Sequence, residues 1–316
     1  MTGDSTAAVT DSHYEHQYLD LLRRVWEHGD ERRDRTGVGT RALFGPQLRF
    51  SLDGGAVPLL TTKRVAWKTA AREMLWFLTG DTNIRRLVEQ KVHIWTDWPL
   101  DRYRRATGEQ VTRDAFEARI LADDAFAAEW GDLGPVYGKQ WVDWPTYEPA
   151  GDDLFRRGNG VNQIAELVEA IRNNPTSRRL LFTGWNVAEL NRMALPPCHM
   201  TYQFFVANGR LSGLLWQRSC DLGLGFAFNA FSAAMLVHML AQQCDLLPGE
   251  LVWSGGDAHI YLNHEHLVRE QLSREPRGHP RLELLRRPTS IFDYKIDDFR
   301  VVDYDPHPHI AAPVAV

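Results

Sequence analysis

Hydrophobic and polar positions along the chain fall into two repeating patterns. Apolar residues recur at helical spacing in residues 18–29, where the pattern stops at Gly29, and in residues 66–80, where it stops at Gly80. This spacing places the apolar side chains on one face of a helix, and glycine commonly follows a helix end. The same spacing predicts helices in residues 83–92, 161–174 and 231–244. The last of these is apolar on nearly all sides, which predicts a buried helix.

Strand-like segments lie between these helices. Residues 46–52, 180–187, 200–219 and 250–262 are rich in β-branched and aromatic residues, and the third contains Asn208-Gly209. That dipeptide favours the tight turn of a β-hairpin. The mixture of elements predicts an α/β (α+β) fold.

The domain organisation is simple, since no repeat or low-complexity linker divides the chain. Residues 1–16 are mostly polar and predict a flexible tail, and residues 17–316 predict a single domain. Within it, residues 99–130 are rich in charge and alanine. We interpret this segment as a helical insertion.

Composition and charge argue against several classes of protein. A net charge of −5 gives no overall attraction to nucleic acid or an anionic membrane, and no apolar run is long enough to span a bilayer. The three cysteines (198, 220 and 244) form no C-x-x-C pair, and the polar N-terminal segment lacks a secretory signal. These features predict a cytoplasmic protein without disulfides. The histidines in HPH (307–309) and NHEH (263–266) lack the usual ligand spacing, so we expect no metal.

Cys198 raises the first chemical question. It follows two prolines in MALPPCHMTYQFFV (residues 193–206) and precedes an alternating apolar run. Free cysteine is among the most buried residue types, so a small apolar core residue is one interpretation. The other is a nucleophile held at the start of a strand by its stiff lead-in. The local sequence leaves both open.

Charged side chains near element ends supply further candidates. Guanidinium groups suit phosphate because they donate in parallel to two oxygens, although a single arginine more often covers surface. Glu73 lies within an otherwise apolar helix, where an unpaired charge is costly, so we expect an acid–base role or a polar partner. The arginines and serine at element ends are Arg35, Arg178, Arg179, Arg218 and Ser219.

Ten sequence blocks together resemble the folate-dependent, cysteine-nucleophile thymidylate synthase family. The resemblance extends from about residue 17 to the C-terminus, and the blocks occur in the family's order. They are DRTGVGT, PLLTTKR, EMLWFLTGDTNI, GDLGPVYGKQW, SRRLL, GWNVAELNRMALPPCH, QRSCD, GGDAHIYLNH, LSREPR and YDPHPHIAAPVAV.

The resemblance implies a fold, a partner and two substrates. The fold is a large mixed sheet that packs back to back against the same sheet in a homodimer, with no membrane and no obligate nucleic acid. The substrates are dUMP or a related pyrimidine nucleotide and 5,10-methylenetetrahydrofolate, without a metal. The implied reaction is reductive methylation of dUMP to dTMP with release of dihydrofolate.

The same resemblance implies roles for matching positions. Arg178 and Arg179 would reach the partner's site, and Arg218 would favour the ionised Cys198 thiol. The implied catalytic residues are Cys198, Glu73, Arg218, Tyr137, His199 and Asn229. The implied nucleotide-binding residues are Arg35, Arg178, Arg179, Arg218, Ser219, Asp221, Asn229, His259 and Tyr261. The implied folate-binding residues are Ile94, Trp95, Trp98, Leu195, Asp221, Gly225, Phe228 and Val316.

One stretch departs from the family pattern. In residues 211–235, Gly223 replaces an expected aromatic residue and Ala227 an expected proline, and Trp216 stands for a tyrosine. Repacking around larger neighbours is one explanation. Entry of water to the reacting carbon is another, and it would give a nucleotide 5-hydroxymethylase of the same family. A non-catalytic nucleotide- or RNA-binding paralogue is a third hypothesis.

Overall fold

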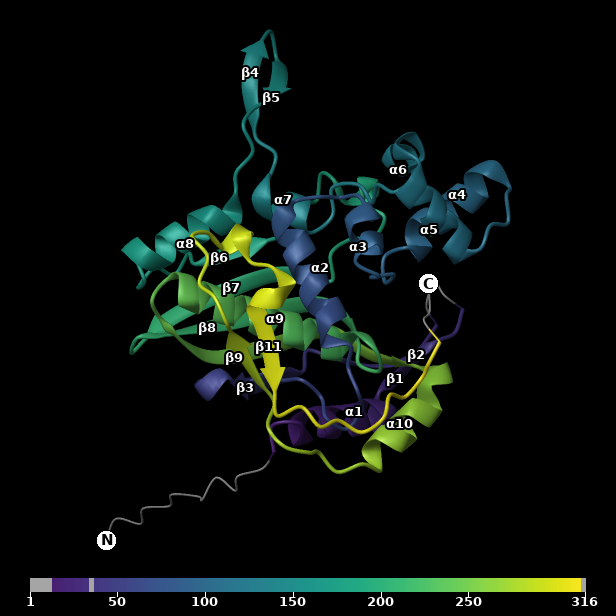
Figure 1. Ribbon diagram of the computed structural model, residues 1–316, viewed down its shortest axis with the longest axis vertical. Coiled ribbons are helices and arrows are strands. Elements are labelled where there is room, and N and C mark those ends of the chain that lie inside the picture. The colour runs from purple at the N-terminus through teal and green to yellow at the C-terminus, as the bar shows by residue number, and fades with distance from the viewer. Residues whose placement is uncertain (1–12, 34–36, 314–316) are drawn as a thin grey trace.

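The computed structural model describes residues 13–33 and 37–313. Its largest element is a seven-stranded mixed sheet with the order β1-β2-β9-β8-β7-β6, to which β3 adds by pairing with β9 (Figure 1). The pair β8–β9 is parallel and the other pairs of this sheet are antiparallel. The strands are β1 Asp30–Arg32, β2 Thr40–Phe44, β3 Gln47–Ser51, β6 Leu181–Thr183, β7 His199–Ala207, β8 Arg210–Asp221 and β9 Leu247–Tyr261. The predicted mixed α/β fold class is confirmed.

The remaining strands form two small two-stranded sheets. β4 (Tyr147–Gly151) pairs with β5 (Leu154–Arg157) in a hairpin that projects from the body (Figure 1). β10 (Arg281–Leu284) pairs with β11 (Phe299–Val302) across a longer connection. The sequence analysis predicted neither pair, because the first is short and charged and the second is short and lies among prolines.

Ten α-helices occur in the described residues. They are α1 His16–His28, α2 Trp67–Thr79, α3 Arg85–Glu89, α4 Asp97–Thr107, α5 Arg113–Ala122, α6 Asp124–Trp130, α7 Gly138–Val142, α8 Gln163–Asn173, α9 Gly225–Gln243 and α10 Glu265–Leu272. Short 3₁₀ turns lie at Asp53–Gly55, Leu190–Arg192, Leu262–His264, Ile291–Asp293 and Ile296–Asp298. The segment interpreted as an insertion contains most of α4 and all of α5 and α6, which group at one side of the molecule (Figure 1).

The long hairpin β7–β8 brings Cys198 and Arg218 to the same end of the sheet. Its turn residues, Asn208 and Gly209, have φ angles of 52° and 72°. Two successive positive φ angles match the twist of a two-residue hairpin, and Asn-Gly tolerates them best. The predicted turn is confirmed. Register then places His199 opposite Gln217.

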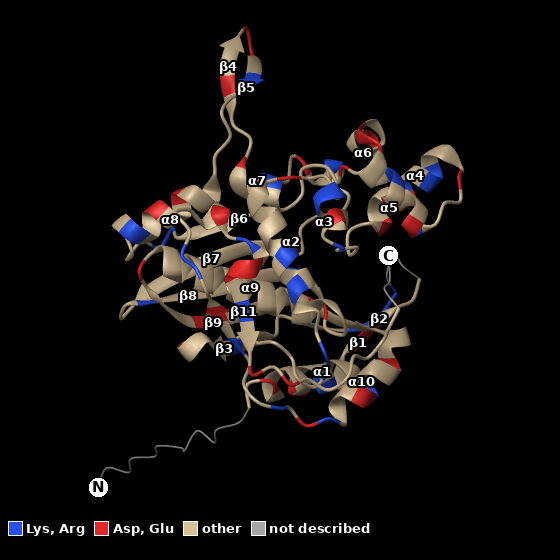
Figure 2. Cartoon of the chain, in the orientation of Figure 1, with Lys and Arg blue, Asp and Glu red and all other residues tan. Residues whose placement is uncertain are grey.

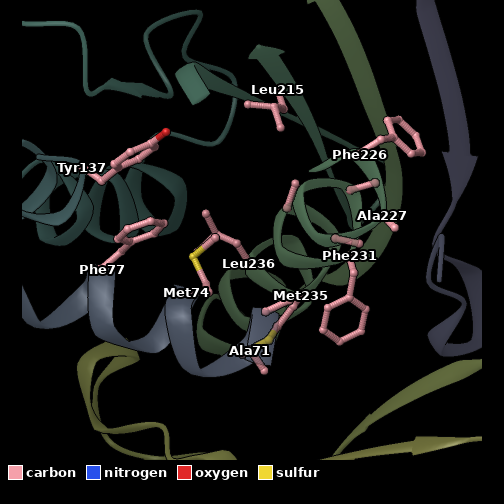
Figure 3. Close-up of a cluster of buried hydrophobic side chains, with 14 of the residues drawn as sticks. Ala71, Met74, Phe77, Tyr137, Leu215, Phe226, Ala227, Phe231, Met235 and Leu236 are labelled. Atoms are coloured by element: carbon pink, nitrogen blue, oxygen red, sulfur yellow. The ribbon is translucent and has the colours of Figure 1, made fainter. Parts of the chain in front are cut away.

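Helix α9 connects the parallel strands β8 and β9 and packs between the sheet and α2. Figure 3 shows Met74 and Phe77 of α2 close to Leu236 of α9, with Leu215 of β8 on the far side. By length and composition alone α9 could cross a membrane, but 78% of its most apolar window is buried inside the described structure. It is therefore the core helix of this fold, as its sequence predicts.

Several boundaries differ from the sequence prediction, and two of them lie near residues predicted to be functional. Helix α9 begins at Gly225 rather than at 231, so Phe228 and Asn229 lie on its first turns, ahead of the predicted start of the helix. Strand β6 ends at Thr183 rather than at 187, because Gly184 and Asn186 turn the chain toward the next segment by local backbone hydrogen bonds.

Charged residues of both signs are interspersed over the outer helices. Figure 2 shows both acidic and basic residues on α8 and on α4 and α5. Many of these pair with each other, as Arg113 does with Asp97 at 2.7 Å and Arg85 with Glu89 at 3.6 Å. Such exposed pairs contribute little to stability, so packing of the core dominates.

Part of the segment assigned to a flexible tail belongs to the folded body. Residues 1–12 lie outside the described residues, but Glu15 is fully buried and α1 begins at His16. The Glu15 carboxylate accepts hydrogen bonds from the backbone N–H groups of Thr61 and Thr62 at 2.7 and 2.9 Å and from both threonine hydroxyls. For residues 13–16 the tail prediction is therefore wrong, because a single polar residue gave no sign of its buried partners.

Replacing Glu15 with alanine should destabilise the fold. Glu15→Ala leaves four buried donors without their acceptor, and we expect the free energy of unfolding to fall by about 3 kcal/mol. Urea denaturation at pH 7 measures it. The exposed Asp20→Ala variant is the control and should change stability by less than about 0.5 kcal/mol. Equal stability of the two variants would contradict the buried network.

Candidate active site

Cys198 is held through its backbone from two sides. It is half-buried and directly precedes β7. Its N–H donates to the Tyr137 hydroxyl at 2.8 Å, and its carbonyl accepts the Arg218 N–H at 3.0 Å. The position of the thiol-bearing residue is therefore set jointly by α7 and β8.

The Arg218 guanidinium is bound to the proline lead-in. Its Nε donates to the Pro197 carbonyl at 2.9 Å and its Nη2 to the Pro196 carbonyl at 2.7 Å. The Trp185 ring lies 5.2 Å from the guanidinium carbon, which is cation–π distance. These bonds use two of the five N–H donors of the group, so a fixed positive charge with further donors stands beside Cys198.

Glu73 reaches the site from α2 as a buried carboxyl group. The Trp95 Nε1–H donates to Glu73 Oε1 at 2.7 Å. Burial raises the pKa of Glu73 to about 7, and the Trp95 hydrogen bond opposes this rise. A carboxyl group that titrates near neutral pH can both donate and accept a proton, as acid–base catalysis requires.

Tyr137 interacts with both Cys198 and Glu73. Its ring stacks on Phe77 with centroids 4.6 Å apart, and Figure 3 shows its hydroxyl pointing away from α2. Burial raises the pKa of Tyr137 well above its ordinary value, and the nearby Cys198 and Glu73 charges add to the rise. The backbone of Tyr137 has φ 24° and ψ −88°, an uncommon conformation for a residue other than glycine. Such strain clusters at functional sites.

A chain of side-chain amides orients Asn229. The Trp253 Nε1–H, which can only donate, binds Gln217 Oε1 at 2.9 Å, and Gln217 Nε2 donates to Asn229 Oδ1 at 2.8 Å. This fixes which side of the Asn229 amide is oxygen and which is nitrogen. An amide of fixed orientation can read the donor–acceptor pattern of a pyrimidine edge.

His199 lies next to this amide chain. Its Nδ1 is 3.1 Å from the Tyr202 hydroxyl, and its side chain also hydrogen-bonds with Asn229. Burial lowers the pKa of His199 to about 4. The imidazole is therefore neutral at physiological pH and can position groups without carrying a charge.

A second group of polar residues lies at the ends of β8 and β9. Ser219 lies opposite Asp257 and Asp221 opposite His259 in the parallel ladder. His259 Nδ1 is 3.0 Å from Asp257 Oδ1, and its ring centroid is 5.3 Å from that of Tyr261. Burial disfavours the charged imidazole, but the Asp257 hydrogen bond and the nearby carboxylates raise the pKa of His259 overall.

The residues predicted to bind folate surround an aromatic wall and a cavity. The Trp95 and Trp98 rings lie 5.2 Å apart, and Trp98 and Leu195 both line a cavity of about 570 Å³. Ile94 is exposed beside them. Across the site, Gly225 and Phe228 lie on the first turn of α9, which follows Asp221.

Two predicted residues lie away from this group, and two others lie outside the described residues. Arg178 and Arg179 are exposed in the segment before β6, where Arg179 lines a separate cavity of about 320 Å³. Arg35 and Val316 lie outside the described residues.

The grouped residues suit nucleophilic addition followed by proton transfer. They combine an accessible thiol, a fixed guanidinium and a carboxyl group with a pKa of about 7. A family model described as thymidylate synthase matches residues 16–316. The chain belongs to the thymidylate synthase family. The predicted family is thereby confirmed.

Curated relatives carry the same name along nearly their whole length. The chain is 70% identical over 305 residues to "Thymidylate synthase" of Rhizorhabdus wittichii, covering 96% of this chain and 99% of the relative. It is 68% identical to that of Novosphingobium aromaticivorans, covering 96% and 97%, and 61% identical to one from Cereibacter sphaeroides, covering 96% and 100%. These names do not favour the hydroxymethylase or the non-catalytic paralogue.

Several polar residues at this thymidylate synthase site escaped the sequence analysis. Gln217 is buried on β8, and the only sequence signal was a polar residue at an inward position of an apolar strand. Lys63 is buried and donates to the Gly223 carbonyl, and burial lowers its pKa to about 8. Asp257 pairs with both His259 and Arg32. Each of these three residues lies in one of the sequence blocks that resemble the family. Its contacts, however, become visible only in the folded structure.

Three of the histidines considered as metal ligands lie at hydrogen-bond distance from backbone carbonyls. His264, His266 and His307 each place Nε2 within 2.9 Å of a carbonyl oxygen. Within residues 13–33 and 37–313, no group of three or more His, Cys, Asp or Glu side chains is arranged to hold a metal ion.

The pKa of Glu73 predicts a pH-dependent stability difference. Between its unfolded pKa of about 4.5 and its folded pKa of about 7, the folded state binds more protons, so stability falls as pH rises through this range. Glu73→Gln removes the titration. Its stability relative to the parent should therefore rise by about 3 kcal/mol between pH 5 and pH 8.5.

Urea unfolding of both proteins at the two pH values measures this difference. The exposed Glu148→Gln variant is the control and should show no comparable change. A constant offset between Glu73→Gln and the parent at both pH values would mean that Glu73 is ionised throughout.

Proposed function

We propose that this chain catalyses the reductive methylation of dUMP to dTMP, with 5,10-methylenetetrahydrofolate as donor of both the one-carbon unit and the hydride. The observation that carries the proposal is the half-buried Cys198, held by Tyr137 and Arg218, in a chain up to 70% identical to named thymidylate synthases. The gathered residue types match the steps that this reaction needs.

The first step requires the cysteine. Carbon 5 of uracil is too weak a nucleophile to attack the one-carbon unit, so the Cys198 thiolate adds to carbon 6 and makes an enolate. The fixed charge of Arg218 favours the thiolate electrostatically. Carbon 5 then attacks the methylene carbon of the folate and forms the new carbon–carbon bond.

The later steps require proton and hydride transfer. Loss of the carbon 5 proton and departure of tetrahydrofolate leave an exocyclic methylene. Hydride from the tetrahydrofolate reduces it to methyl as the Cys198–carbon 6 bond breaks, and dihydrofolate is released. Glu73, with Tyr137 and His199, would handle the proton movements at O4 and carbon 5.

Nucleotide recognition would use the polar groups at the strand ends. Asn229 would pair with the pyrimidine edge because Gln217 fixes its amide orientation. Arg35, Arg218 and Ser219 would bind the phosphate, while His259 and Tyr261 would bind the ribose hydroxyl. Asp221 would belong to both the nucleotide and folate sites.

Folate would bind on the other side of the base. Trp95, Trp98 and Leu195 would provide the apolar wall, and Ile94, Gly225 and Phe228 would complete it. Val316 would close over the bound folate and keep water from the methylene. The described cysteines form no disulfide, which is typical of a protein in a reducing, cytoplasmic location.

The sheet face turned away from α9 supports a homodimer. Leu181, Phe205 and Trp216 lie on adjacent strands and are 43%, 68% and 49% exposed. Large apolar residues in such number on one face are typical of a protein–protein interface. A second copy packed there, sheet against sheet, would cover them and bring Arg178 and Arg179 to the partner's nucleotide phosphate.

Loss of the thiol should abolish turnover. In Cys198→Ser, dTMP formation should fall by about a thousandfold or more, because the hydroxyl is a far weaker nucleophile at neutral pH. Release of tritium from C5-labelled dUMP and mass spectrometry of the product measure both addition and methylation. Cys244→Ser, which changes a buried cysteine elsewhere, is the control and should retain activity. Near-parental turnover in Cys198→Ser would overturn the mechanism.

A charge on the exposed sheet face should prevent dimer formation. Phe205→Asp would bury an unpaired carboxylate in the proposed interface, so sedimentation velocity should show monomer and activity should fall with it. The control is Phe155→Asp on the β4–β5 hairpin, which is similarly exposed but lies off the sheet face. A dimer that persists in Phe205→Asp would exclude this interface.

A further inference from the structure

Two histidines hold the described end of the C-terminal segment. The Nε2 of His264, in the turn before α10, lies 2.8 Å from the Pro313 carbonyl, and the Nε2 of His266 lies 2.7 Å from the Ala311 carbonyl. Figure 1 shows this segment running beside α10. Because a carbonyl can only accept, each Nε2 must carry the proton.

The other nitrogen of His264 faces the active site. His264 is fully buried, and its Nδ1 has no hydrogen-bond partner within the described structure. The nearest acidic oxygen is Asp221 Oδ1 at 3.9 Å, and that oxygen is itself held by the Gly223 N–H at 2.8 Å. Buried polar atoms without partners are rare and costly. The Nδ1 of His264 is therefore a buried polar atom without a partner in the described structure, next to a residue predicted to bind folate.

Gly223 provides the space for this approach. A Cβ atom at position 223 would lie 2.8 Å from His264 Nδ1 and 3.1 Å from Asp221 Oδ1. The first distance is too short for any real side chain unless the imidazole moves. The glycine that departs from the family pattern thus gives the His264 ring its place against Asp221.

We propose that His264 is a positioning residue that couples the Asp221 corner of the folate site to the C-terminal segment. When folate contacts Asp221, the surroundings of the His264 Nδ1 change. Because the imidazole ring is rigid, a movement at Nδ1 also moves Nε2 and its hydrogen bond with the Pro313 carbonyl. His266 holds the segment at Ala311 but is exposed to solvent. This inference rests on the proposed function, because it takes folate as the ligand at Asp221.

Two conservative variants separate the two ends of the ring. The amide of Gln extends to the position of Nε2, so His264→Gln keeps a donor for Pro313 and loses the group facing Asp221. The shorter Asn places its amide near Nδ1, so His264→Asn does the opposite. His266→Asn is the matched control, and Gly223→Ala displaces the ring without changing it. Thermal unfolding verifies that each variant is folded.

The readouts are the affinity for tetrahydrofolate in the presence of dUMP, followed by tryptophan fluorescence, and the KM and kcat of turnover. We expect His264→Gln and His264→Asn each to weaken folate binding and raise its KM about tenfold, with dUMP affinity unchanged. Gly223→Ala should behave similarly, and His266→Asn should change folate binding less than about twofold. Combining His264→Gln with Asp221→Asn should weaken folate binding no further than Asp221→Asn alone.

Three results would overturn the coupling. These are parental folate affinity in both His264 variants, effects that multiply in the double variant, or an equal loss in His266→Asn. If the parent protein binds folate and forms dTMP while the variants match it, only this inference fails. If the parent protein neither binds folate nor forms dTMP, the proposed function fails and takes the coupling with it.

Discussion

Arg218 makes two hydrogen bonds to the carbonyls of Pro196 and Pro197, and its own backbone N–H binds the carbonyl of Cys198. The other constraints of the site follow from this contact. Proline cannot donate a backbone hydrogen bond, so the lead-in to Cys198 offers only acceptors, and a guanidinium is the group that satisfies two of them at once. The charge that favours the thiolate is thereby part of the structure that holds the cysteine.

The scaffold around this contact is built from two buried layers. Helix α9 is apolar on nearly every side because it packs against both the sheet and α2. Polar groups that reach the site therefore come from the ends of elements or from single inward positions such as Gln217 and Glu73. Each of these has a fixed partner, Trp253 or Trp95, whose indole N–H can only donate. A donor-only partner fixes the orientation of the Gln217 amide, and at Glu73 it favours the ionised form of a carboxyl group whose pKa burial raises.

Much of the fold and part of the site could be predicted from the sequence. Helices α1, α2 and α8 and the β7–β8 turn follow from spacing and from Asn208-Gly209, which are local signals. Family motifs pointed to Cys198, Arg218 and Asn229, and the structure groups these residues. The burial of Glu15, the pairing of His264 with Pro313 and the role of Gln217 depend on partners 46, 49 and 12 or more residues away in the chain. A pattern read along one segment carries no trace of such contacts.

The place of β9 in the sheet has a consequence for how the chain is synthesised. β9 pairs with β2, β3 and β8, yet it is the last strand of the large sheet to leave the ribosome. Until residues 247–261 emerge, two early strands and the long hairpin have an open edge each. The sheet can therefore be completed only late in translation or after it. Asp221 and His259 become neighbours in the β8–β9 ladder at the same stage. Nascent chains will carry unpaired β edges during this interval, which is the state that chaperones recognise and that aggregation exploits.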